Sequence, residues 1–170
     1  MTGAVDLQNL IAYSDHERAK WKTWLAADPA TRLAIPFQSG ARFPTVGSLL
    51  NHVFWVEERH LARLEGNLVP ETAGAPEHDL DALFEYADRV RATLSQFVAT
   101  ADTRRINEPI TFSLRGGPLM KVLRRKLATH ILLHEIRHFA QLAYAVRIAG
   151  HEPPGEHDYF FAPIDLAEGV

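Results

Sequence analysis

Apolar residues recur every three to four positions along four stretches of the chain, which predicts four long amphipathic helices. The first spans residues 6–27 and the second spans 45–64, with Thr45 as its N-cap. The third begins at residue 79 and has the most regular pattern, and the fourth spans 120–147. Rods of similar length with one apolar stripe each are typical of a bundle.

Two shorter segments are predicted to be extended, residues 32–37 and 106–112, and we expect them to pair as a short edge ribbon. Pro118 suits the first turn of the last helix. The aromatic tail, residues 151–170, is expected to pack over the bundle as a strap. The sequence thus predicts an all-α four-helix bundle with short extended segments between the helices, in a single domain over residues 1–170.

Three histidines lie on the stripe of the last helix that is expected to face the core. At about 100° per residue, His130, His134 and His138 align with Leu127 and Gln141. A buried polar group without a partner costs roughly 2–7 kcal/mol, so each imidazole needs a hydrogen bond or a metal ion. Imidazole is the commonest protein ligand for zinc, nickel or iron, and three histidines in i, i+4 register favour coordination over three separate core histidines.

A complete metal site needs a ligand from another helix, because a third histidine on one straight helix reaches the same ion poorly. The second predicted helix offers His52 at the edge of its apolar arc and His60 nearer the centre, and geometry does not choose between them. Three protein ligands leave a coordination position open, as in catalytic sites. For either residue, an interfacial histidine without metal is the alternative.

The middle of the first helix is unusually polar, with the run Ser14-Asp15-His16-Glu17-Arg18. Such a run either faces solvent or lines a pocket. If it lines the metal pocket, His16, Asp15 or Tyr13 are candidate acid–base or orienting groups.

Composition narrows the chemistry further. The 170 residues include no cysteine, which excludes disulfides, thiolate ligands and a cysteine nucleophile on this chain. The formal net charge is only −3 and the charges are mixed, so neither a nucleic acid nor a membrane surface is an expected partner. Without an apolar run of about 20 residues or a targeting signal, the chain is expected to be cytoplasmic.

The segment His134-Glu135-Ile-Arg-His138 also has the H-E-x-x-H spacing of zinc proteases. In those enzymes the glutamate activates a water molecule and the substrate lies against an edge strand. The predicted scarcity of sheet disfavours this interpretation.

Two segments of the predicted helices stand out. The first is Gly47-Ser-Leu-Leu-Asn-His52 followed by Glu57-Glu58-Arg, and the second runs from His130 to Gln141 and on to Arg147-Ile-Ala-Gly150. Together they resemble the DinB/YfiT family of metal-dependent four-helix-bundle proteins. The resemblance implies that His52, His134 and His138 are the metal ligands, which resolves the choice that geometry leaves open. One departure is Phe139-Ala140, where the family usually has Arg-Gly.

Four further residues are candidates for positions around the ligands or in a substrate pocket. Gln141 lies one turn past His138 and can orient an imidazole, Arg137 is placed to stand in for the missing arginine, and His130 and His16 complete the set.

The same resemblance implies a divalent metal, zinc or nickel, and a thiol-dependent transferase or isomerase that acts on a small-molecule substrate. A low-molecular-weight thiol would arrive as cosubstrate and be activated at the open coordination position. The alternatives are a non-catalytic stress-response or binding protein whose metal ties helices together, and a structural bundle without metal. Self-association as a homodimer is expected through Phe160, Phe161, Trp21 and Trp24, if these lack cover within the chain.

Overall fold

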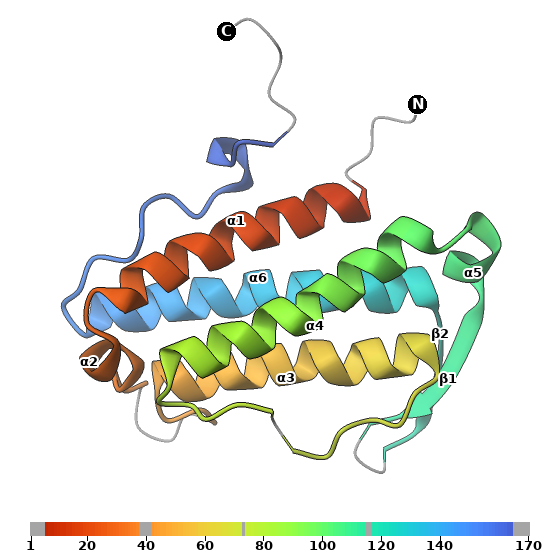
Figure 1. Cartoon of the computed structure of the whole chain (residues 1–170), viewed down its shortest axis with the longest axis horizontal. Helices are drawn as coiled ribbons and strands as arrows, with labels where there is room; N and C mark the ends of the chain where they lie inside the picture. Colours follow the sequence, from red (N-terminus) through yellow and green to blue (C-terminus); the bar gives the residue numbers. More distant parts are fainter. Residues whose placement is uncertain (1–5, 38–41, 73, 115–116, 165–170) are drawn as a thin grey trace, which may run out of the picture.

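The structure is a computed structural model that describes residues 6–37, 42–72, 74–114 and 117–164. Four long helices form the bundle: α1 (Leu7–Ala26), α3 (Val46–Glu65), α4 (Leu80–Thr100) and α6 (Arg124–Ile148). α1 packs against α4 and α6, and α3 packs against the same two helices, so that each helix has two principal neighbours (Figure 1). The predicted all-α four-helix bundle is confirmed.

The chain crosses the full length of the bundle between α3 and α4. Residues 66–72 and 74–79 lie along the path from the end of α3 back to its beginning, so α3 and α4 run in the same direction (Figure 1). The crossover ends directly over the first turn of α3, where a Cβ atom on Gly47 would lie 2.0 Å from the carbonyl oxygen of Glu77. Only glycine leaves room for this close approach.

Local capping signals set the starts of the second and third long helices where the sequence predicts them. The Thr45 hydroxyl accepts a hydrogen bond from the amide of Ser48 at 3.2 Å, and the Ser48 hydroxyl accepts one from the amide of Thr45 at 2.9 Å. Asp79 caps α4 by accepting from the amide of Ala82 at 3.0 Å. Gly66, at φ 81°, ends α3 in the left-handed conformation.

Two predictions for the connecting segments are wrong. Residues 32–33 belong to a short helix, α2 (Pro29–Leu33), because Asp28 caps it and proline fits its first turn. Beyond it only Pro36 forms a bridge, and its partner is Thr45. The predicted ribbon between residues 32–37 and 106–112 is therefore absent from the described residues.

The extended segment near residue 110 pairs with a neighbour in sequence instead. β1 (Pro109–Ser113) follows the short helix α5 (Thr103–Asn107) and pairs antiparallel with β2 (Leu119–Leu123). Pro118 directly precedes β2, and residues 120–123, predicted as the start of the last helix, belong to that strand, so α6 begins at Arg124. A hairpin closes a shorter loop than the long-range ribbon would, at a smaller cost in chain entropy.

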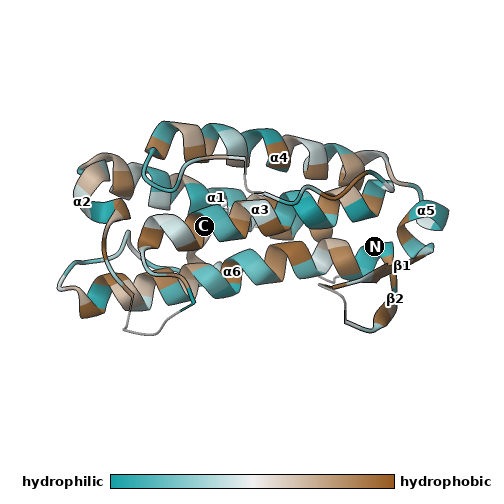
Figure 2. Ribbon diagram, turned by 90° about the horizontal axis from the view of Figure 1, so that it is seen from below, coloured by the Kyte–Doolittle hydropathy of each residue, from teal (hydrophilic) through white to brown (hydrophobic). Residues whose placement is uncertain are grey.

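The buried face of α6 differs from the predicted stripe by about one residue. Ile131, Leu132, Leu142 and Val146 are at most 1% exposed, and Figure 2 shows apolar bands alternating with polar ones along the helix. His130 and Gln141, which the stripe placed in the core, are exposed. Charged Glu135 also lies on the buried face, so the pattern of apolar residues alone does not identify this face as the buried one.

A cluster of buried charges joins all four long helices at the centre of the bundle. Glu135 of α6 accepts from Arg18 of α1, Arg91 of α4 and the hydroxyl of Ser14. Glu57 of α3 accepts from the same two arginines, and its Oε1 lies 2.8 Å from Nε of Arg91. The four charged residues are at most 5% exposed. Two positive and two negative groups balance here, as a buried ion cluster requires.

Ser14 and Arg18, in the polar middle of the first helix, therefore neither face solvent nor line a metal pocket. They belong to the buried charge cluster. Burial alone would raise the pKa of Glu135, but the guanidinium groups of Arg18 and Arg91 outweigh it and hold this pKa below 4.5. Because the folded-state pKa is the lower one, the stabilisation is present above pH 4.5 and is lost as the pH falls further.

The tail covers α1, as the predicted strap requires. The ring of His157 stacks on Trp21 at 5.3 Å between centroids, and the Tyr13 hydroxyl donates to the carbonyl of His157 at 2.5 Å. Residues 165–170 lie outside the described residues. Within the described part of the chain, no helix is long and apolar enough to cross a membrane.

Fewer of the aromatic residues proposed for a dimer interface are exposed than predicted. Trp21 is fully covered within the chain, so the expectation that it lacks cover is wrong. Phe160 and Phe161, in the short 3₁₀ helix η1 (Tyr159–Phe161), are 80% and 61% exposed. Self-association stays a prediction.

We expect Glu135→Ala to lower the free energy of unfolding by roughly 3–5 kcal/mol, because it leaves Arg18 and Arg91 sharing one buried carboxylate. Urea denaturation followed by circular dichroism measures the change. Glu85→Ala is the control, since Glu85 lies exposed on α4 and forms no side-chain hydrogen bond or ion pair within the described part of the chain, and it should change stability by less than about 0.5 kcal/mol. Equal losses in the two variants would contradict the role given to the buried cluster.

Candidate metal centre

Three histidines from two helices converge beside the core. His52 of α3 meets His134 and His138 of α6, and one ring nitrogen from each lies within 4.8 Å of the others. The Nε2 atoms of His134 and His138 are 3.1 Å apart. Two nitrogens bound to one tetrahedral ion at 2.0–2.1 Å would be separated by about 3.3 Å. The spacing of this pair therefore fits a shared ion.

Packing of α3 against α6 determines this arrangement. His134 and His138 are one turn apart and project from the same side of α6. His52 faces them because α3 begins at the Thr45 cap and packs along α6, which puts residue 52 opposite these two turns. The ring centroids of His52 lie 5.3 Å and 5.4 Å from those of His134 and His138.

A hydrogen bond fixes the tautomer of one candidate ligand. Oε1 of Gln141 accepts from Nδ1 of His138 at 2.6 Å, so the proton of the neutral ring is on Nδ1. The lone pair on Nε2 then points toward His134. Two such nitrogens 3.1 Å apart need a proton or a cation between them, and a cation would bond to both.

The two candidate ligands on α6, His134 and His138, are held in the neutral form that binds metal. Burial, with further contributions from His138, His52, His130 and Arg137, lowers the pKa of His134 to about 2. Burial and the nearby Arg137 and Arg42 also lower the pKa of His138, although its bond to Gln141 opposes them. Neutral imidazoles are the form that coordinates a divalent ion, so the donor set fits one.

The three histidines open on a cavity of about 300 Å³. Its wall combines imidazoles, arginines and apolar groups, and no carboxylate of the described residues contributes to it. Phe43, from the loop before α3, packs on His52 with ring centroids 4.3 Å apart. The lining residues are Arg42, Phe43, His52, Trp55, Val56, Arg59, His60, Arg63, Leu114, His130, His134, Arg137 and His138.

The structure brings most of the predicted pocket residues to this cavity. His130 lines it next to His60, with ring centroids 5.3 Å apart. Arg137 lines it as well, and its Nη2 lies 3.5 Å from Nε2 of His138. Gln141 does not line the cavity but holds His138 from behind.

Residues of the first helix do not reach the cavity. His16 lies in a separate groove, with Trp24 and Pro154. Asp15 accepts from Arg91 at 2.7 Å, and the hydroxyl of Tyr13 is bonded to the tail. These residues are too occupied or too remote to act as acid–base groups at the three histidines.

Sequence reasoning missed Trp55, Arg59 and Arg63 on α3, and Arg42 on the loop before it. Their signal was present, since residues 52, 55, 59 and 63 follow one another at spacings of three or four and so share a face of one helix. The sequence-based prediction considered only the histidines of this helix and not the arginines and the tryptophan beside them.

The H-E-x-x-H interpretation fails on the position of its glutamate. Glu135 is 1% exposed and points into the bundle, where it is bonded to Arg18 and Arg91. A glutamate of a zinc protease must instead face the water that it activates. Glu135 has a structural role here.

Comparison with known proteins assigns the chain to a family. The family model described as "DinB family" matches residues 1–163 of the 170. The chain belongs to the DinB family. A comparison with curated proteins finds no match. The family is generally metal-binding, and the three-histidine group of this DinB-family chain can hold a metal ion.

We expect the purified, untagged chain to bind one zinc or nickel ion and His134→Ala to bind it more than about 100-fold more weakly. Gln141→Leu should weaken binding by about 10–100-fold, because it frees the ring of His138 and removes the bond that fixes its tautomer. Isothermal titration calorimetry with zinc measures both. His16→Ala is the matched control, a helical histidine away from the cavity. Unchanged affinity in His134→Ala would refute the site.

Proposed function

We propose that this DinB-family protein is a divalent-metal-dependent enzyme that uses a low-molecular-weight thiol, as an S-transferase or a thiol-dependent isomerase. The supporting observation is that the three histidines border a cavity rather than lying enclosed in the core. A structural zinc site is closed by four protein ligands, whereas a site with three leaves room for a small molecule.

A zinc or nickel ion at His52, His134 and His138 would supply Lewis acidity, which lowers the pKa of a thiol toward neutrality. The chain contains no cysteine, so the sulfur nucleophile has to come from a cosubstrate. In the transferase reaction the thiol loses its proton to solvent, sulfur bonds to the electrophilic carbon, and the electron pair leaves with the displaced group. An isomerase would add the thiol, allow bond rotation, and then break the same S–C bond.

Residues of the cavity favour the anionic form of the sulfur. The guanidinium of Arg137, 3.5 Å from Nε2 of His138, brings a positive charge to the place where a thiolate would lie. Phe43 packs over His52 and Trp55 lines the adjoining wall, so apolar surface replaces part of the water around the site. A lower local dielectric strengthens the attraction between the sulfur anion and the charges beside it.

The main alternative is a non-catalytic binding or stress-response protein in which the ion only ties α3 to α6. It has the same ligands and the same metal stoichiometry. It differs in predicting a large loss of thermal stability on chelation without any metal-dependent reaction.

We expect zinc- or nickel-loaded protein to conjugate a low-molecular-weight thiol to monochlorobimane faster than metal-free protein, with cysteine, glutathione and coenzyme A tested separately. His138→Ala should lose at least about 100-fold of the metal-dependent rate, because it removes a ligand nitrogen. Fluorescence of the bimane adduct gives the rate. His16→Ala should retain it. Equal rates for loaded and metal-free protein with every thiol would favour the non-catalytic alternative.

A further inference from the structure

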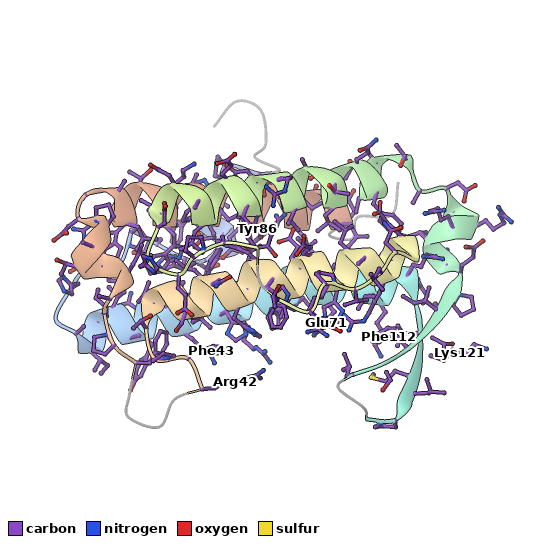
Figure 3. The ribbon with its side chains drawn as sticks, turned by 60° about the horizontal axis from the view of Figure 1, so that its bottom comes forward. Arg42, Phe43, Glu71, Tyr86, Phe112 and Lys121 are labelled. Atoms are coloured by element: carbon purple, nitrogen blue, oxygen red, sulfur yellow. The ribbon has the colours of Figure 1, made fainter. Side chains whose placement is uncertain are left out.

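The cavity is elongated, and the metal centre occupies only one end of it. His52 and His60 both line it, and they are eight residues apart on α3, about 12 Å along the helix. His138 and His130 are separated in the same way on α6, which runs in the opposite direction. In Figure 3, Arg42 and Phe43 lie toward one end of α3 and Phe112 toward the other.

The end remote from the metal centre is formed by His60, His130, Arg59 and Arg63, here called the distal end. The His60 and His130 rings are 5.3 Å apart, edge to face. Nη1 of Arg63 lies 3.4 Å from Nδ1 of His60. Arginine can only donate, so Nδ1 of His60 accepts and the proton of its neutral ring is on Nε2. The distal end therefore presents hydrogen-bond donors. Burial is the main reason that the pKa of His60 is lowered to about 3, which keeps its ring in this neutral form.

Neither arginine of the distal end has an anionic partner. Within the described part of the chain, no carboxylate forms an ion pair with Arg59 or Arg63, nor with Arg42 and Arg137 nearer the metal centre. Arg18 and Arg91, by contrast, are each paired with two or more carboxylates. The positive charge at the cavity is thus local, in a chain whose formal net charge is −3.

Both guanidinium groups are held in place by other contacts. Arg59 lies over the ring of Trp55 at 4.7 Å, and Arg63 lies over Phe112 of β1 at 5.1 Å. Nη1 of Arg63 also donates to the carbonyl of Arg59 at 3.1 Å. Two like charges one helical turn apart repel each other, and an anion between them would relieve that repulsion. Fixed donors of this kind bind carboxylate or phosphate without losing much side-chain entropy.

We propose that the distal end is a subsite for an oxyanion, a carboxylate or a phosphate, that belongs to the thiol cosubstrate or its electrophile. Arg63 and Arg59 bind its oxygens, with Nε2–H of His60 as a further donor. The molecule spans about 12 Å, with its anionic group at the distal end and its reacting atom at the three histidines. The position of the reacting atom rests on the function proposed above, whereas anion binding at Arg59 and Arg63 does not.

The test is a titration of the full-length chain with inorganic phosphate and, separately, with succinate, followed by NMR of ¹⁵N-labelled arginine side chains. Either anion should shift the Arg59 and Arg63 signals saturably. Arg63→Gln and Arg59→Gln should each weaken binding about tenfold, the contribution of a charge-assisted hydrogen bond. The tighter of the two anions assigns the class, phosphate or carboxylate.

Arg89→Gln is the matched control, because Arg89 also lies over an aromatic ring, that of Tyr86, without an ion pair among the described residues, but on α4 away from the cavity. It should bind like the wild type. Repeating the titration on chelated, metal-free protein separates this proposal from the enzymatic one. Affinity within about threefold of the loaded protein supports a distal subsite even if no thiol transfer is found.

Three results would overturn the subsite. The first is that neither anion binds. The second is that binding is unchanged in both Arg63→Gln and Arg59→Gln, or equally weakened in Arg89→Gln, which would mean general charge attraction. The third is that chelation abolishes binding, which would place the anion at the metal centre. Circular dichroism of each variant confirms that it is folded, and two independent arginines keep the test valid if one variant fails to fold.

Discussion

The rotation of α6 about its own axis depends on Glu135. Its carboxylate lies between Arg18 and Arg91 and forms an ion pair with each. Buried charges without partners are costly, so these pairs favour packing of α6 with Glu135 turned inward. Neighbouring residues on a helix differ by about 100° in direction. With Glu135 at the centre of the bundle, His134 and His138 necessarily lie on the flank that faces α3. The buried charges thus position the three histidines without contacting them.

This rotation explains why the three histidines border a cavity. Had they occupied the centre of the bundle, as a simple apolar stripe suggests, the core would enclose any ion and no small molecule could reach it. At the flank, His138 is 5% exposed while His130 is open to solvent, so the helix passes from core to cavity within two turns. Stability and ligand access are supplied by adjacent faces of the same helix.

Local signals in the sequence were sufficient for the helices and part of the site. Thr45, Asp79 and Gly66 act through contacts within four residues, so the limits of α3 and the start of α4 follow from sequence alone. The start of α6 has no capping side chain, and the prediction missed it. The convergence of His52 with the α6 pair was expected from family resemblance, because geometry alone left His60 equally possible. The inward face of α6 was misjudged because Glu135 reads as a surface residue until Arg18 and Arg91, 117 and 44 residues away in sequence, are placed beside it.

Two groups of arginines in the bundle differ in whether a carboxylate neutralises their charge. Arg18 and Arg91 are buried in ion pairs with Glu57 and Glu135, and these pairs link the four long helices. Arg59 and Arg63 are held by aromatic rings, which fix a guanidinium without neutralising it. A charge that is positioned but not compensated contributes little to folding and keeps its full attraction for a ligand. Since α3 carries His52 on the same face, a molecule drawn to these arginines lies along the path to the three histidines.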